Sequence, residues 1–196
     1  MKSFAVFHGL PAGTTRIVGS AEISAIGANW STVNAGGRSK SLSASVESAG
    51  AFVVAIRIDR DTGTVTPERI VWIDDAGTII NPLLADGQLE GSLAQGWGQA
   101  MMEEVALDPG GQMLSGTLMD YAIPRADDVP HAEIGHAHSP SPRNPLGAKG
   151  IGEAGTIGIP PAMVSAVVDG LSPFGVSHLD MPLTPERIWR ALSAGR

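Results

Sequence analysis

The chain has 196 residues, 43% of them apolar, so it is long enough to bury a core of its own. Its formal net charge of −7 argues against nucleic acid as a partner, because nucleic-acid-binding proteins carry basic patches. The sequence has no run of 18 apolar residues and residues 1–9 lack the features of a secretory signal, so no membrane partner is expected and the cytoplasm is the expected compartment.

The chain contains no cysteine, which excludes disulfide bonds, a cysteine nucleophile and iron–sulfur clusters with cysteine ligands. Two of the five histidines, His136 and His138, are spaced so that a strand would place both on one face. A metal site needs further ligands at a suitable spacing, and the sequence offers no convincing third one. We therefore expect no metal ion to be held by side chains of this chain.

Residues 1–45 are the least readable part of the chain. Arg16–Ile26 is compatible with a strand followed by a short helix, and the stretch 34–48 is rich in glycine and serine, as loops and linkers are. We therefore divide the chain into an unassigned N-terminal segment, residues 1–45, for which flexibility is one interpretation, and one domain, residues 46–196.

A β-hairpin is predicted just after this boundary. Ala51–Ile58 and Arg69–Ile73 are short apolar runs with β-branched residues, which is typical of strands. The connection between them contains Gly63 at a position where a left-handed backbone conformation is expected. We expect the two strands to pair in antiparallel fashion.

A long helix is predicted from about Pro82 to Glu104. Asn81 is a typical N-cap residue, and a proline is favoured at the first helical position. Asp74 and Asp75 precede this start. We interpret both as turn-forming carboxylates that also lie favourably near a helix N-terminus.

One face of this predicted helix consists of small residues. Four of them are spaced three or four apart: Gly87, Gly91, Ala94 and Gly98. Each glycine costs about 1 kcal/mol of helix stability relative to alanine, and close approach of another backbone or of a ligand would compensate for it. Gln88 and Gln95 lie near the same face, and a primary amide both donates and accepts hydrogen bonds. Each amide is either a ligand contact or the polar edge of a packing face.

The remaining elements are a strand and two further helices. A strand is predicted over His131–His138, after a turn at Asp108–Gly111. Apolar residues at helical spacing predict a helix over Ala162–Leu171, with Thr156 as a candidate cap and two prolines in its first turn. Thr184 is the expected N-cap of a last short helix that ends near residue 192.

The stretch Asn144–Ala154 most strongly suggests a binding site, because it has glycines at positions 147, 150 and 152. Such glycines permit positive φ angles, and successive backbone N–H groups in such a turn bind anions. The carboxylate of Glu153 would then lie beside the bound group, where a base can remove a proton. The alternative is an ordinary glycine-rich turn with a glutamate on the surface.

Five residues of this stretch fit a known signature position for position: Gly147, Lys149, Gly150, Gly152 and Glu153. The stretch resembles the Gly-x-Lys-Gly-x-Gly-Glu signature of the large subunit of molybdenum hydroxylases. That family includes xanthine dehydrogenase, aldehyde oxidoreductase and aerobic carbon monoxide dehydrogenase. The resemblance runs from about residue 50 to residue 192 and includes further motifs in the family's order: Asp75–Pro82, Gly87–Gly98, Ser115–Pro124 and Leu183–Arg187.

The resemblance implies a molybdenum–molybdopterin cofactor, for which the cytosine dinucleotide form is one option, and a general base at Glu153. It implies that Gln88, Lys149, Gly150, Ile151 and Gly152 contact the cofactor, with Gln95 left as a structural residue. For Lys149 an ion pair within the protein is the alternative. The reaction implied is oxidation of an aldehyde, an N-heterocycle or CO, with water as the oxygen source.

The same resemblance implies partners, because the family's large subunit is several times longer than this chain. We expect the remaining part of the molybdenum subunit on another chain, an iron–sulfur subunit and an FAD subunit, with no iron–sulfur cluster or flavin in this chain. The alternative function is a non-catalytic or truncated cofactor-binding module. In either case the chain alone is expected to be inactive.

The predicted fold class is α+β. We expect a mixed β-sheet with one long glycine-faced helix and shorter C-terminal helices, as in the C-terminal part of a molybdenum-cofactor-binding domain.

Overall fold

The computed structural model describes residues 17–23, of which only the backbone is considered, and residues 48–194. The described residues form four strands: β1 (Ile17–Ile23), β2 (Ala49–Ile58), β3 (Val65–Asp75) and β4 (Ala132–His136). They also form helices α1 (Pro82–Met101), α2 (Ala154–Leu171) and α3 (Pro185–Ala194), and a 3-10 turn η1 (Ser172–Phe174). The predicted α+β class is confirmed.

Of the N-terminal segment 1–45, strand β1 is the part that the structure describes. It lies within the range where the sequence predicts a strand. The short helix predicted to follow it, and the loop predicted over residues 34–47, lie outside the described residues.

The four strands form one mixed sheet in the order β1-β2-β3-β4. The first three pair in antiparallel fashion, and β4 pairs with β3 in parallel. The predicted hairpin between β2 and β3 is confirmed, and Gly63 has the expected positive φ of 74°. A parallel pair needs a long connection, and here α1 and the chain that follows it provide that connection.

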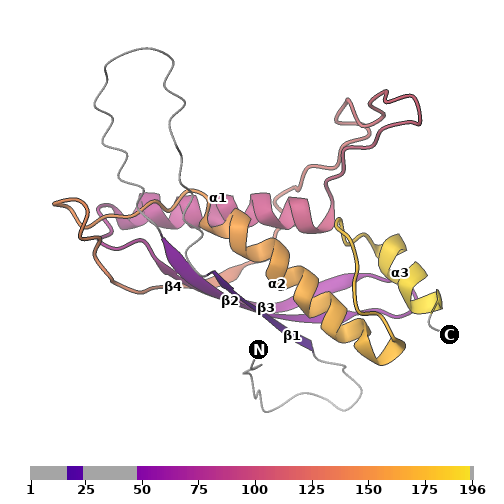
Figure 1. Cartoon of the computed structure of the whole chain (residues 1–196), viewed down its shortest axis with the longest axis horizontal. Coiled ribbons are helices and arrows are strands. Elements are labelled where there is room, and N and C mark those ends of the chain that lie inside the picture. The colour runs from indigo at the N-terminus through magenta and orange to yellow at the C-terminus, as the bar shows by residue number, and fades with distance from the viewer. Residues whose placement is uncertain (1–16, 24–47, 195–196) are drawn as a thin grey trace.

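Helices α1 and α2 lie side by side on one face of the sheet, with α2 against β1 and β2 (Figure 1). Alternate residues of β2 and β3 point into this face, and the rings of Phe52 and Trp72 stack there with their centres 4.5 Å apart. The largest fully buried side chains come from both layers: Phe52, Ile56, Ile70, Trp72, Leu89, Ile159 and Met163.

Helix α2, extended to Phe174, is long and apolar enough to cross a membrane by length and composition alone. However, 61% of its most apolar window is buried inside the fold, between α1 and the sheet. A helix that is apolar on most sides is also what a protein core contains. The position of α2 in the fold therefore accounts for its composition.

Helix α1 begins where the sequence predicts it and ends three residues earlier. The side chain of Asn81 accepts a hydrogen bond from the N–H of Leu84 at 3.3 Å, as an N-cap residue does. At the other end, the N–H groups of Met102 and Glu103 both donate to the carbonyl of Gly98, which closes the helix before residue 104.

The close approach expected along the glycine face of α1 occurs only at its C-terminal half. A Cβ atom at Gly87 or Gly91 would meet nothing within 4 Å. A Cβ atom at Gly98 would lie 2.6 Å from Cγ of Pro124, and one at Gly96 would lie 2.8 Å from the carbonyl oxygen of Gly155. Gly96, which is not on the predicted face, thus marks the crossing of α1 and α2.

Helix α2 begins eight residues before its predicted start at Ala162, so this boundary is wrong. The helix follows directly after Glu153, and Pro160 and Pro161 lie inside it rather than in its first turn. Each proline removes one backbone hydrogen bond. Buried apolar contacts of the first turns, which include Ala154 and Ile159, compensate for that loss. Thr156, the predicted cap, instead contacts α1.

Residues 102–131, which we call the arm, extend at their middle away from the sheet, at the upper right of Figure 1, while Met102 and Val129 pack against the core. The arm is held together by a bridge between Leu107 and Met113 and by a 2.9 Å hydrogen bond from the N–H of Ala106 to Oγ of Ser115. The predicted turn at Asp108–Gly111 lies between the bridged residues, where the N–H of Gly111 donates to the carbonyl of Asp108.

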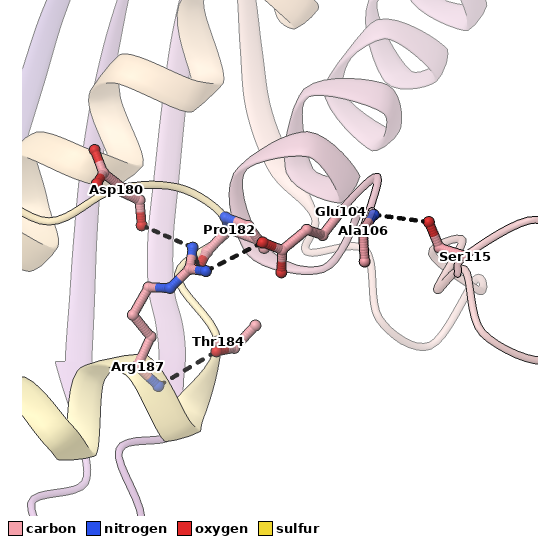
Figure 2. Close-up of polar contacts among 7 residues, drawn as sticks. All are labelled: Glu104, Ala106, Ser115, Asp180, Pro182, Thr184 and Arg187. Carbon is pink, nitrogen blue, oxygen red and sulfur yellow. Dashed lines mark hydrogen bonds and ion pairs between the residues drawn. The ribbon is translucent and has the colours of Figure 1, made fainter. Parts of the chain in front are cut away.

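Helix α3 anchors the base of the arm through Arg187 (Figure 2). The guanidinium lies 3.3 Å from Glu104 and donates to the carbonyl groups of Asp180 and Pro182. The predicted N-cap of this helix is confirmed, because Oγ1 of Thr184 accepts from the N–H of Arg187 at 3.3 Å. The C-terminal helix and the arm are therefore one connected unit.

Candidate functional site

The end of β3 carries two consecutive acidic residues in different environments. Because side chains alternate along a strand, Asp74 lies on the same face as Ile70 and Trp72, and Asp75 lies on the other. Asp74 is completely buried, and neither of its carboxylate oxygens has a hydrogen-bond partner among the described residues. Burial raises the pKa of Asp74 to about 6, against the opposing charge of His136.

Asp75 is also largely buried, but its carboxylate has hydrogen-bond and ion-pair partners. Its Oδ1 accepts hydrogen bonds from the N–H of Gly77 at 2.9 Å and of Ser139 at 3.1 Å, and its Oδ2 lies 3.3 Å from Nζ of Lys149. Burial alone would raise the pKa of Asp75, but these hydrogen bonds and the ammonium group lower it to about 2. The predicted turn role is therefore confirmed for Asp75. The predicted turn role is wrong for Asp74, because its side chain lies on the core face of β3 and makes no hydrogen bond in the turn.

The glycine-rich stretch lies against the turn that follows β3. Gly147 has a positive φ of 69°, as expected, whereas Gly150 and Gly152 do not. The carbonyl of Gly147 accepts from the N–H groups of Thr78 at 3.0 Å and Ser141 at 2.9 Å. The N–H of Lys149 donates to the carbonyl of Ala76 at 2.9 Å. The stretch is thus fixed by backbone hydrogen bonds up to Lys149.

Immediately beyond Lys149, the backbone N–H groups no longer have hydrogen-bond partners within the described residues. The N–H groups of Gly150, Ile151, Gly152 and Glu153 have no hydrogen-bond acceptor within the described part of the chain. Gly152 and Glu153 are exposed. Four successive unpaired N–H groups at an exposed position are suited to binding an anionic or oxo group.

Gln88 of α1 comes to this same point. A Cβ atom at Gly152 would lie 3.3 Å from Oε1 of Gln88, so the absence of a side chain at Gly152 leaves room for the amide. The segment that enters α2 passes along the N-terminal half of α1 (Figure 1). The Gln88 amide is exposed and has no partner among the described residues. The structure therefore brings together Gln88 and the predicted residues 150–153.

Glu153 occupies the N-cap position of α2, but its side chain does not cap the helix. The residue is exposed, and its carboxylate makes no hydrogen bond or ion pair with the described residues, whereas its backbone carbonyl accepts from the N–H of Ile157 at 3.0 Å. Lys149 pairs with Asp75 and not with Glu153. The carboxylate of Glu153 is therefore not used by the described part of the fold.

Polar contacts join the middle of α1 to the start of α2 beside this site. Oγ of Ser92 accepts from the N–H of Gly155 at 3.1 Å, and Oγ1 of Thr156 lies 3.1 Å from Oε1 of Gln95. Gln95 thus has the structural contact expected of it. A Cβ atom at Gly155 would lie within 2.7 Å of backbone atoms of α1, so the two helices are in backbone contact here.

The two histidines of the His-x-His motif have separate partners, since His136 contacts Asp86 at 3.0 Å and His138 contacts the carbonyl of Gly77 at 3.0 Å. Asp75 and Ser92 hold the glycine-rich stretch and the start of α2, and the prediction did not include them as site residues. Asp75 belongs to the Asp75–Pro82 motif, but two of its partners, Ser139 and Lys149, lie more than 60 residues away in sequence.

A shallow cleft of about 380 Å³ lies elsewhere, at the beginning of β3 and the end of the arm. Its lining includes Arg69, Asp127 and His131. It shares no residue with the site around Gln88 and the glycine-rich stretch. We therefore do not connect it with a cofactor.

Comparison with known proteins gives the family. Residues 13–130 match the family described as the molybdopterin cofactor-binding domain. The chain is 43% identical over 143 residues to the carbon monoxide dehydrogenase large chain of Hydrogenophaga pseudoflava, covering 73% of this chain and 18% of that protein. It is 39% identical over 144 residues to the nicotine 6-hydroxylase large subunit of Paenarthrobacter nicotinovorans, covering 74% of this chain and 18% of that protein.

Comparison with solved structures gives the same family. The Cu,Mo-CO dehydrogenase matches with a TM-score of 0.74 and 34% identity, over 76% of this chain and 19% of that one. Quinoline 2-oxidoreductase from Pseudomonas putida 86 matches with a TM-score of 0.72 and 41% identity, again over 76% and 19%. The chain thus spans about a fifth of the length of these relatives. It belongs to the molybdopterin cofactor-binding domain family, the family of the molybdenum hydroxylase large subunits.

Proposed function

We propose that this chain forms the part of a molybdenum hydroxylase catalytic subunit that holds one side of the molybdenum–pterin cofactor and provides its general base, Glu153. One observation carries the proposal. The amide of Gln88 lies beside Gly152, in the run of unpaired N–H groups of residues 150–153 that ends at the exposed side chain of Glu153.

The residues present fit such a cofactor. The unpaired N–H groups of Gly150, Ile151 and Gly152 are hydrogen-bond donors suited to anionic and oxo groups, and the start of α2 adds the positive end of a helix dipole. The Gln88 amide can donate and accept, as the mixed edge of a pterin requires. Lys149 is paired with Asp75, so it contributes a positive charge near the site and not a direct contact with the cofactor.

The molybdenum centre, when bound, supplies a Lewis acid that activates oxygen derived from water and takes up two electrons. The role of the chain is positional and acid–base. The carboxylate of Glu153 would accept the proton given up by that water-derived oxygen. The substrate class is an aldehyde, an N-heterocycle or CO, in keeping with the names of the relatives.

The proposed enzyme needs other chains. The relatives include a large chain, a large subunit and a subunit gamma of a dehydrogenase complex, and each is about five times longer than the matching part of this chain. We propose the remaining part of the molybdenum subunit, an iron–sulfur subunit and an FAD subunit as partners, in the cytoplasm. The cytosine dinucleotide form of the cofactor belongs to the same proposal.

The small share of its relatives that the chain covers supports one alternative function. A chain that spans about a fifth of its relatives would also serve as a non-catalytic cofactor-binding module that works only with a partner chain. In that case the Gln88 contact would be retained and turnover would not depend on Glu153.

Replacement of Gln88 tests the cofactor site. In the assembled enzyme, Gln88→Leu should lower the molybdenum content per complex several-fold, because it removes an amide from an exposed site without disturbing the core. Gln99→Leu is the matched control, since Gln99 is an exposed glutamine near the other end of α1. Equal molybdenum content in both variants and in the unchanged protein would contradict the proposed contact.

A further inference from the structure

One carboxylate connects three separate segments around the proposed site. Asp75 accepts hydrogen bonds from Gly77 in its own turn and from Ser139 after β4, and it pairs with Lys149 in the glycine-rich stretch. The carboxylate is therefore the point at which the end of the sheet holds the stretch that leads to Glu153.

The backbone around this carboxylate is packed so that the stretch has little freedom. Gly77 and Gly147 both have positive φ angles and face each other, and a Cβ atom at Gly77 would lie 2.2 Å from the carbonyl oxygen of Gly147. Hydrogen bonds from Thr78 to Gly147 and from Lys149 to Ala76 close the contact on both sides. The backbone N–H groups of residues 150–153 make no such hydrogen bonds within the described part of the chain. The ion pair is thus the last attachment before the open residues 150–153.

The ion pair is shielded from water, which strengthens its hold on the stretch. The side chains of Lys149 and Asp75 are 14% and 12% exposed. Removal of one member of a buried pair leaves the other without compensation, so the loss is larger than at the surface. The pair between Arg69 and Glu133, at the other end of β3 and β4, is about half exposed and should matter little.

We propose that Asp75 is a positioning residue that acts through Lys149 and fixes residues 147–153, so that their open N–H groups and Glu153 face one site. This inference rests on the proposed function for its catalytic consequence. Its structural consequence, local order of the stretch, stands independently of any cofactor.

Hydrogen exchange of the chain and kinetics of the assembled enzyme test the proposal together. Asp75→Asn keeps an oxygen acceptor for the two backbone N–H groups but loses the charge that holds Lys149. We expect amide exchange to rise about tenfold or more over residues 147–153, with exchange in β2 and the middle of α1 unchanged. In the assembled enzyme, kcat should fall at least about tenfold while KM stays within about twofold, because Glu153 is misplaced rather than removed.

Lys149→Met provides the second variant, and Glu133→Gln is the control. Lys149→Met should reproduce both effects, and the double variant Asp75→Asn with Lys149→Met should add little to either single one, since both act through one contact. Glu133→Gln should leave exchange and rate unchanged.

Three results separate the outcomes. Uniformly faster exchange across the whole chain with normal kcat in Asp75→Asn would overturn the positioning role, as would additive effects in the double variant. Local exchange in residues 147–153 together with full activity of Glu153→Gln would support the structural hold and reject the proposed general base. Faster amide exchange confined to residues 147–153 together with a lowered kcat supports both the positioning role of Asp75 and the general base Glu153.

Discussion

At the residue scale, Asp74 and Asp75 show how neighbouring carboxylates acquire opposite properties. Burial without partners raises the pKa of Asp74 to about 6, while hydrogen bonds and Lys149 lower the pKa of Asp75 to about 2. Asp74 therefore binds its proton more tightly in the folded chain than in the unfolded one. Its contribution to the free energy of unfolding falls as the pH rises from about 4 through about 6.

Asp74→Asn should remove this decline. A pKa difference of about two units corresponds to about 3 kcal/mol between pH 4 and pH 7.5. Urea unfolding at these two pH values should show a smaller loss of stability with rising pH in the variant than in the unchanged chain. The same pH dependence in both proteins would mean that Asp74 is not the buried acid responsible.

The candidate residues of the proposed site could be proposed from the sequence, and the residues that hold them could not. Gln88 and Gly150–Glu153 lie in recognisable local motifs, and the structure places Gln88 beside Gly152. Asp75 and Ser92 act on partners more than 60 residues away, so neither spacing nor local propensity could reveal their roles. The burial of Asp74 depends on the tertiary packing of the sheet in the same way.

At the element scale, the crossing of α1 and α2 determines where the glycine-rich stretch meets Gln88. Gly155→Ala should lower the free energy of unfolding by about 1 to 3 kcal/mol, because its Cβ would lie 2.4 Å from Oγ of Ser92 and 2.6 Å from the backbone N of Leu93. Gly91→Ala is the matched control. It faces open space on α1 and should raise stability by up to about 1 kcal/mol.

Thermal unfolding followed by circular dichroism compares the two variants directly. If Gly155→Ala and Gly91→Ala change the melting temperature in the same direction and by the same amount, the close contact between the helices is not essential to the fold.

Element boundaries were predictable where local chemistry defines them. Gly63, Asn81 and Thr184 fixed a hairpin and two helix starts. The start of α2 was not predictable in this way, because Pro160 and Pro161 normally begin a helix rather than continue one. Packing against α1 outweighed that local preference, and the result is a helix that starts directly at Glu153.

At the scale of the whole molecule, the described chain leaves much apolar surface exposed. Several large side chains of the arm are exposed, including Leu118 at 77% and Met119 at 93%. Leu83 and Leu84 at the start of α1 are exposed to 80% and 66%. Exposed apolar surface of this extent is typical of a protein that meets partners, and it fits the proposed assembly with the rest of a molybdenum subunit.

The central claim is that Glu153 is the general base of a molybdenum hydroxylase, and Glu153→Gln in the assembled enzyme tests it most directly. Glutamine keeps the size and hydrogen-bonding reach of glutamate but cannot take up a proton at neutral pH. Because the side chain of Glu153 is exposed and has no partner among the described residues, the variant should keep its melting temperature and its molybdenum content.

The turnover rate should fall at least about a hundredfold, as expected when a general base is lost, and the acidic limb of the rate–pH profile should disappear. The measurement is the rate–pH profile of the variant, taken beside its metal content and melting temperature. A stable variant that holds its full molybdenum content and turns over at the normal rate would contradict the assignment of Glu153.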